Sequence, residues 1–149
     1  TMKKTVHRLA GTLALLLISS FWLATILTEL SGREEAIFLA KRSILYAMAL
    51  LIPSLMITAG SGIALAGKRA GRLVNAKKKR MPFIALNGLL ILVPSAVFLW
   101  WKAGQGEFDL SFVVVQAIEL AAGATNITLM GLNMRDGIRL SRMLARRPV

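Results

Sequence analysis

Four long apolar stretches, almost free of charged residues, limit the folds that are open to this sequence. The stretches cover residues 9–28, 43–67, 81–101 and 110–134, and Glu119 is the one charged residue inside them. A helix of about 20 apolar residues, rising about 1.5 Å per residue, crosses the ~30 Å hydrocarbon core of a bilayer. A soluble core does not require four uninterrupted segments of this length. The pattern therefore predicts four membrane-spanning helices.

The connections between the stretches indicate how these helices pack. The segment "WWKAGQGEFD" between the third and fourth stretches contains two glycines and is short, which favours antiparallel neighbours. The N-terminal apolar run has no small-residue cleavage site, so we expect an uncleaved first helix rather than a secretory signal. We expect one all-α integral membrane domain, residues 1–149, folded as an up-down-up-down four-helix bundle. The expected spans are about 9–28, 44–66, 82–101 and 110–134, with a basic tail at 135–149.

The basic residues are divided unevenly between the two sides of the predicted bundle. Of the 19 Lys and Arg residues, 15 fall on the side that carries both termini and the 68–80 loop. The other four are Arg33, Lys41, Arg42 and Lys102. The positive-inside rule then places both termini in the cytoplasm, as expected for a multi-pass protein of a bacterial inner membrane. The formal net charge of +12 lies at a membrane surface in this arrangement, so we expect no nucleic-acid partner.

Two basic segments on the terminal side are candidates for contact with anionic lipids. The loop before the third span contains four consecutive basic residues, and the tail carries four arginines on one helical face at spacings of 4, 3 and 4. Such surfaces attract the anionic lipids of the cytoplasmic leaflet; a dedicated protein partner is the alternative. The residues are Lys77, Lys78, Lys79, Arg80, Arg135, Arg139, Arg142 and Arg146.

The fourth span carries polar and small residues along one face. The stripe consists of Gln116, Glu119, Gly123, Asn126, Met130 and Asn133. In a membrane bundle, such a face turns towards neighbouring helices, because close approach and hydrogen bonds are available there. The spans, as drawn from the sequence, offer Glu119 no basic partner. We therefore expect its carboxyl group to be protonated and to donate a hydrogen bond inside the bundle.

Two prolines at a similar depth suggest where Glu119 would find its acceptor. A proline inside a helix frees the carbonyl group four residues earlier, and kinked helices leave a gap between them. Pro53 and Pro94 would free the carbonyl groups of Ala49 and Leu90, for which Glu119 or Gln116 is a suitable donor. The candidate ligand-binding residues are Glu119, Gln116, Asn126, Ser54, Pro53, Pro94 and Asn87. The alternative is that these polar side chains simply hold the helices together, Asn87 and Asn126 above all.

The opening "HRLAG" at residues 7–11, followed by an apolar helix, resembles the first helix of small bacterial four-helix inner-membrane proteins of the b-type cytochrome-like plan. The resemblance covers that helix alone. The family plan implies paired histidines within the spans, whereas His7 is the single histidine of this chain. Bis-histidine haem within one chain is therefore excluded. Haem held by histidine and methionine would pair His7 with Met130; a surface histidine is the alternative.

The sequence contains no arrangement of residues that is typical of catalysis, and it contains no cysteine. We expect a non-enzymatic binding or accessory subunit that holds a lipid-soluble ligand or a membrane partner in an outer-half cavity near Glu119, with no cofactor of its own. One alternative is an electron-transfer protein with quinone or haem. Another is a small transporter, which would be oligomeric because four helices seldom enclose a path alone. A homo-oligomer or a larger membrane complex fits either the first or the last of these functions.

The charge distribution leads to a test of topology. Single cysteines placed at residue 105 and in the C-terminal tail should react with a membrane-impermeant reagent from opposite sides of the membrane. Reporter fusions at the same positions should agree. Labelling of both cysteines from one side would contradict the four-span arrangement.

Overall fold

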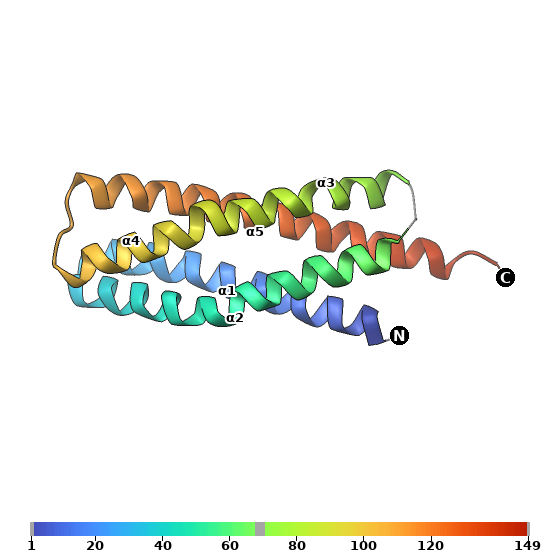
Figure 1. The fold of residues 1–149 in the computed structure, drawn as a ribbon, viewed down its shortest axis with the longest axis horizontal. Coiled ribbons are helices and arrows are strands. Elements are labelled where there is room, and N and C mark those ends of the chain that lie inside the picture. Colours follow the sequence, from blue (N-terminus) through green and yellow to red (C-terminus); the bar gives the residue numbers. More distant parts are fainter. Residues whose placement is uncertain (1, 68–70, 149) are drawn as a thin grey trace.

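The computed structural model describes residues 2–67 and 71–148, and all the regular structure in this part of the chain is helical. The α-helices are α1 Met2–Ser31, α2 Glu34–Ala66, α3 Arg72–Asn87, α4 Val93–Gly104 and α5 Leu110–Ala145. A π-helical turn, Gly88–Leu92, joins α3 to α4, so that these two helices form one continuous rod. Four long rods therefore run antiparallel (Figure 1). The predicted all-α fold with four long helices is confirmed.

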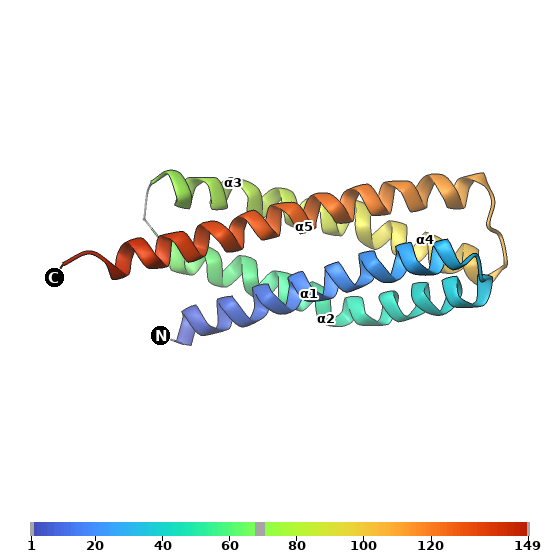
Figure 2. The same cartoon turned by 180° about the vertical axis from the view of Figure 1, so that it is seen from behind.

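The rods form a bundle with two different ends. Both chain termini lie at one end, which we call the terminal end (Figure 1). The turn between α1 and α2 and the loop between α4 and α5 lie at the other, which we call the loop end. Helix α1 packs against α2 and α5, and α5 packs against α1, α3 and α4 (Figure 2). Each rod thus contacts its neighbours in sequence, and α5 closes the bundle against α1.

The four rods are long and apolar enough to cross a membrane, with 30, 33, 33 and 36 residues. Their outward faces carry large apolar side chains, among them Leu27, Ile63, Leu90 and Val113, and each of these residues is 57% or more exposed. A protein in water would have to hide most of this surface. The outer surface is therefore suited to lipid.

The helices extend well beyond the expected spans. Helix α2 begins at Glu34 rather than near residue 44, and α5 continues to Ala145, so most of the predicted tail is helical. The reason is that helix propagation is cheap once an apolar segment is helical, and the flanking Glu, Lys, Arg and Ala residues are good helix formers. The charged residues therefore lie where the apolar segments end, whereas the helices continue past them.

The loop end is fixed by charged and polar contacts at the start of α5. The Asp109 side chain accepts a hydrogen bond from the Phe112 backbone N–H at 3.1 Å, which caps the helix. Lys102 Nζ, at the end of α4, donates to Asp109 Oδ2 at 2.6 Å and to Glu107 Oε2 at 3.0 Å. The Lys102 ammonium, together with the Ser111 hydroxyl and the cap, holds the pKa of the Asp109 carboxyl well below its usual range. Asp109 therefore stays ionised at any ordinary pH, and the loop holds α4 against α5.

The two predicted proline sites are accommodated differently from what the sequence suggested. Pro94 follows the π-helical turn, in which the Val93 N–H donates to the Gly88 carbonyl five residues back. This wider turn gives the chain room where proline removes a backbone donor. Pro53 lies inside α2, and both prolines are exposed on the outside of the bundle.

A pair of asparagines fastens α3 to α5 in the middle of the bundle. Asn87 Nδ2 donates to Asn126 Oδ1 at 2.8 Å and to the Ala122 carbonyl at 2.9 Å. Asn126, which is fully buried, donates in turn to the Ile84 carbonyl at 3.3 Å. Apolar residues from all the rods, including Ala14, Leu51 and Met130, surround this region. The asparagines therefore act as an interhelical clamp.

Replacing Asn126 with Leu should weaken this clamp while preserving shape. We expect a loss of about 1–2 kcal/mol in the free energy of unfolding, because the hydrogen bonds of Asn126 with Asn87 and with the Ile84 carbonyl both disappear, while Asn87 keeps its bond to Ala122. Reversible unfolding in mixed micelles measures the change. Thr128→Val, on the exposed face of the same helix, is the matched control, and an equal loss in both variants would contradict the clamp.

Candidate functional site

A buried lysine joins α2 to α5 towards the loop end. Lys41 is 1% exposed, and its ammonium donates hydrogen bonds to Gln116 Oε1 and, at 3.4 Å, to Glu119 Oε1. Gln116 Nε2 donates to the same oxygen of Glu119 at 3.4 Å. About seven residues of helix from Glu34 place Lys41 ~10 Å below the start of α2. Three polar side chains thus meet inside the bundle, one from α2 and two from α5.

Lys41 reaches this position because α2 starts early. Within a helix that begins at Glu34, Lys41 falls on the same face as Ile37, Ile44 and Met48, and all four side chains are buried. The limits of the uncharged stretches put Lys41 in an outer loop and left Glu119 without a basic partner. Both expectations are wrong, since the structure gives Glu119 a cationic partner. Glu119 therefore accepts a hydrogen bond from Lys41, where the sequence suggested that it would donate one.

A second carboxylate, Glu29 in the last turn of α1, belongs to the same cluster. Glu29 lies close enough to Lys41 and Glu119 to interact electrostatically with both. One oxygen of each carboxylate, Glu29 Oε1 and Glu119 Oε2, is buried and has no hydrogen-bond partner within residues 2–67 and 71–148. The cluster therefore combines two carboxylates with one ammonium and leaves two buried acceptor atoms unused.

A small cavity of about 40 Å³ adjoins Glu119 at the centre of the bundle. Its wall is mainly apolar, with Glu119, Thr25 and Trp22 as the polar lining residues. Trp22 Nε1 donates to the Leu120 carbonyl at 2.9 Å, and a Cβ atom at Gly123 would stand 3.0 Å from the Trp22 ring. The glycine thus makes room for the indole that closes the cavity. This volume suits one or a few water molecules.

The structure brings the predicted ligand-binding residues together only in part. Glu119 and Gln116 share the site with Lys41, and the polar stripe of α5 faces the bundle as predicted. Ser54 is buried, but its hydroxyl donates to the Leu50 carbonyl and it does not line the cavity. Pro53 and Pro94 face outwards. Gln116 and Glu119 are engaged by Lys41, so the expected bonds to proline-freed carbonyl groups are wrong.

The haem alternative, which would pair His7 with Met130, finds no support in the positions of these two residues. His7 Nδ1 donates to the Thr58 carbonyl at 3.1 Å and contacts the Ser61 hydroxyl at 3.0 Å. A Cβ atom at Gly62 would touch both the His7 ring and Met81, so Met81 is the methionine beside His7. Met130 instead packs in the apolar core. Among the described residues there is also no group of three or more His, Cys, Asp or Glu side chains suited to a metal ion.

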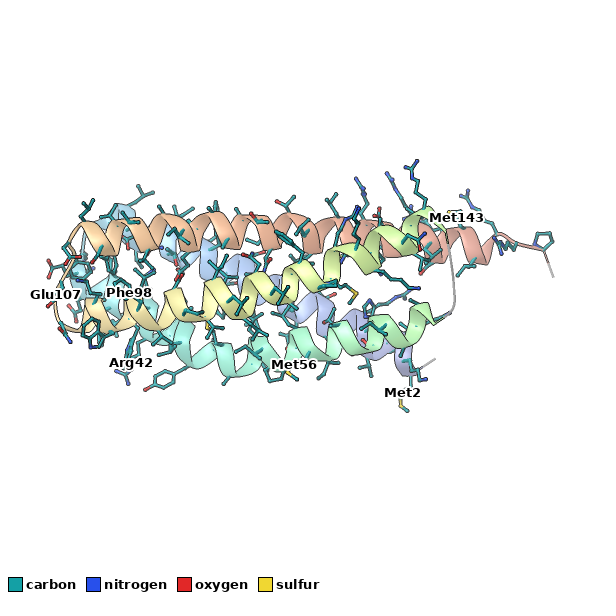
Figure 3. The ribbon with its side chains drawn as sticks, turned by 45° about the horizontal axis from the view of Figure 1, so that its top comes forward. Met2, Arg42, Met56, Phe98, Glu107 and Met143 are labelled. Atoms are coloured by element: carbon teal, nitrogen blue, oxygen red, sulfur yellow. The ribbon has the colours of Figure 1, made fainter. Side chains whose placement is uncertain are left out.

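Seven of the eight basic residues predicted to meet anionic lipid divide into two groups, and the eighth, Lys77, is partly buried beside Gly137. Arg80 and Arg135 both contact the buried carboxylate of Asp136. Lys78, Lys79 and the arginines that follow Arg135 along the helical face are exposed at the terminal end, where basic side chains gather (Figure 3). These arginines are Arg139, Arg142 and Arg146. Lys68 and Arg69 of the same basic loop lie outside the described residues.

Comparisons with known proteins give this chain no family. No family model matches it, and neither the curated proteins nor the solved structures contain a significant match.

Sequence reasoning missed Lys41 and Glu29, the two charged partners of Glu119. A signal for Lys41 is present, because Ile37, Lys41, Ile44 and Met48 follow a helical spacing of 4, 3 and 4. Thr25 and Glu29 show a spacing of four in α1, and Thr25 is 1% exposed. These spacings indicate that Lys41 and Glu29 lie on the inner faces of their helices, but only if the helices continue beyond the uncharged stretches.

Removal of the Lys41 charge should strongly destabilise the bundle. Lys41→Met would leave Glu119 without its cation, and breaking a buried pair in this way costs about 3–5 kcal/mol. The double variant Lys41→Met, Glu119→Leu should recover most of the loss. Unfolding of all variants in mixed micelles gives the coupling free energy.

The adjacent residue provides the control for this measurement. Arg42 is exposed and lies over the Tyr46 ring, so Arg42→Met removes a charge outside the bundle. If Lys41→Met were no more destabilising than Arg42→Met, the buried pair would not stabilise the fold.

Proposed function

We propose that this chain is a non-enzymatic binding subunit of the membrane, with Glu119 as the ligand-binding residue and Lys41 and Gln116 as the residues that orient it. One observation carries the proposal. Lys41 and Gln116 hold one oxygen of Glu119, while the other oxygen is buried without a hydrogen-bond partner in the described part of the chain. Unused buried acceptors are costly, and each calls for a donor or a cation.

The size of the cavity narrows the class of ligand. Pockets for drug-sized molecules typically measure about 300–1,000 Å³, whereas the cavity beside Glu119 measures about 40 Å³. We therefore propose a proton or a water-sized polar species in place of the lipid-soluble ligand that the sequence suggested. A quinone or haem needs far more room, and the placement of His7 adds nothing in favour of electron transfer.

We further propose that the terminal end faces the cytoplasm of a bacterial inner membrane. The support is the excess of Lys and Arg at that end, together with four helices of membrane-spanning length. In this orientation the Glu119 site lies in the outer half of the membrane, about 14 Å below the start of α5.

Infrared difference spectroscopy on protein in lipid nanodiscs tests the binding of a proton at Glu119. A proton bound at Glu119 should give a carboxyl signal that Glu119→Gln removes. Glu107→Gln, at an exposed acid of the loop end, should retain this signal. A folded Glu119→Gln variant with the same carboxyl signal as the wild type would rule out Glu119 as the proton-binding group.

A small oligomeric transporter is the second candidate, because ionisable groups inside membrane helices often mark ion pathways. The observation in its favour is the cluster of Glu29, Lys41 and Glu119 itself. Vesicles that enclose a pH-sensitive dye distinguish the two functions. A transporter should dissipate an imposed proton gradient, and Glu119→Gln should slow it, whereas a binding subunit leaves the gradient intact.

A further inference from the structure

A second buried carboxylate organises the terminal end of the bundle. Asp136 in α5 is 2% exposed. Its Oδ2 accepts a hydrogen bond from Arg80 Nη1 of α3 at 2.7 Å, and its Oδ1 lies 3.2 Å from Arg135 Nη2. Arg80 Nη1 also donates to Asn133 Oδ1 at 3.3 Å. Asp136 thus fixes the positions of two guanidinium groups, one from each of two neighbouring helices.

Lys77 adds a third cation to this group. A Cβ atom at Gly137 would stand 3.1 Å from Lys77 Nζ, so the ammonium lies directly over the bare backbone of α5. Lys77 is close enough to Asp136 and His7 to interact electrostatically with both. Within the described residues, no acceptor forms a hydrogen bond with its ammonium. Lys77 therefore sits between helices with hydrogen-bond donors to spare.

The charges of this cluster do not balance. Lys77, Arg80 and Arg135 supply three positive charges, and Asp136 supplies one negative charge. Both hydrogen bonds of Arg80 to described residues leave from Nη1, so Nη2 and Nε remain for another acceptor. An ammonium beside a guanidinium fork is a donor set that suits the oxygens of a phosphate group.

The position of the cluster indicates where such a phosphate would come from. Arg80 lies at the terminal end of the 81–101 apolar stretch, at the level where lipid headgroups would begin. Phe83, three residues further into that stretch, is 56% exposed on the outer surface, where an acyl chain would pass. We propose that Lys77, Arg80 and Arg135 form a specific site for the phosphate of one anionic lipid headgroup, with Asp136 as the residue that positions the two arginines.

This site differs from the general attraction of a basic surface to anionic lipid. In a diffuse field, each Lys or Arg near the membrane contributes about equally, so Lys77 and the exposed Lys79 would be interchangeable. In the proposed site, Lys77 faces Gly137 between the helices, and Lys79 has no place in the cluster. The geometry of Lys77 should therefore matter as well as its charge.

Native mass spectrometry of protein released from micelles containing phosphatidylglycerol tests the proposal. Wild type should retain one phosphatidylglycerol, and Lys77→Gln should lower the affinity about tenfold, as expected for the loss of one charge-assisted hydrogen bond. Lys79→Gln removes the same charge and should remain within about twofold of the wild type. Equal losses in Lys77→Gln and Lys79→Gln would show a diffuse field and overturn the specific site.

A second pair of variants separates geometry from charge, and it applies even if Lys77→Gln folds poorly. Gly137→Ala keeps every charge but displaces the Lys77 ammonium, so lipid retention should fall. Gly131→Ala, where an added Cβ atom meets nothing within 4 Å, is the control on the same helix. Unchanged retention in a folded Gly137→Ala variant would overturn the proposal.

Free phosphate serves as the last arm of the experiment. Inorganic phosphate at millimolar concentration, about 1–10 mM, should compete weakly with phosphatidylglycerol, because it gains no contact with the outer apolar surface. If inorganic phosphate displaced the lipid completely, the site would belong to a soluble anion and the lipid assignment would be wrong.

Discussion

A charge that leaves water needs compensation, and this requirement governs how the four rods fit together. The bundle buries Lys41 near one end and Asp136 near the other, and each meets opposite charge from a different helix. Each contact restricts the rotation of two rods at once, because a helix turned by one residue would point its charge at lipid. The apolar packing between these contacts is compatible with many rotations. The two charged clusters therefore select one arrangement among them.

The two clusters differ in the sign of their net charge. Near the loop end, two carboxylates face one ammonium, and at the terminal end three cations face one carboxylate. Neither cluster is neutral by itself, and each has hydrogen-bonding atoms to spare. This pattern distinguishes the clusters from the asparagine clamp in the middle, where Asn87 and Asn126 satisfy each other and the backbone. The clamp needs no further partner, which is why the proposed binding sites lie at the two ends.

The fold could be predicted largely from the sequence, and the charged site only in part. An uncharged apolar stretch of about 20 residues matches, as a helix, the thickness of the hydrocarbon core of a membrane. The number and order of the long helices could therefore be predicted directly. The face of α5 that packs inside the bundle could be predicted from the helical spacing of its polar and small residues. The helix ends could not be read in the same way, because a charged side chain is as acceptable in a helix above the membrane as in a loop. That single gap put Lys41 outside the bundle and left Glu119 without its partner. The outward position of Pro53 and Pro94 could not be predicted either, because the presence of a proline does not determine which side of the helix faces the bundle.

The π-helical turn in the third rod keeps its buried side straight. Buried residues occur at Ile84, Gly88, Leu92 and Ala96, four apart each time. At about 100° per residue, three such steps overshoot whole turns by ~120°, and a plain α-helix would wind this row around the rod. One extra residue in the π-helical turn takes up most of the excess. The π-helical turn therefore keeps the buried residues before and after it on the same side of the rod. Deleting one residue within 88–92 would rotate the loop-end half of the rod and turn Lys102 away from Glu107 and Asp109, which precede α5.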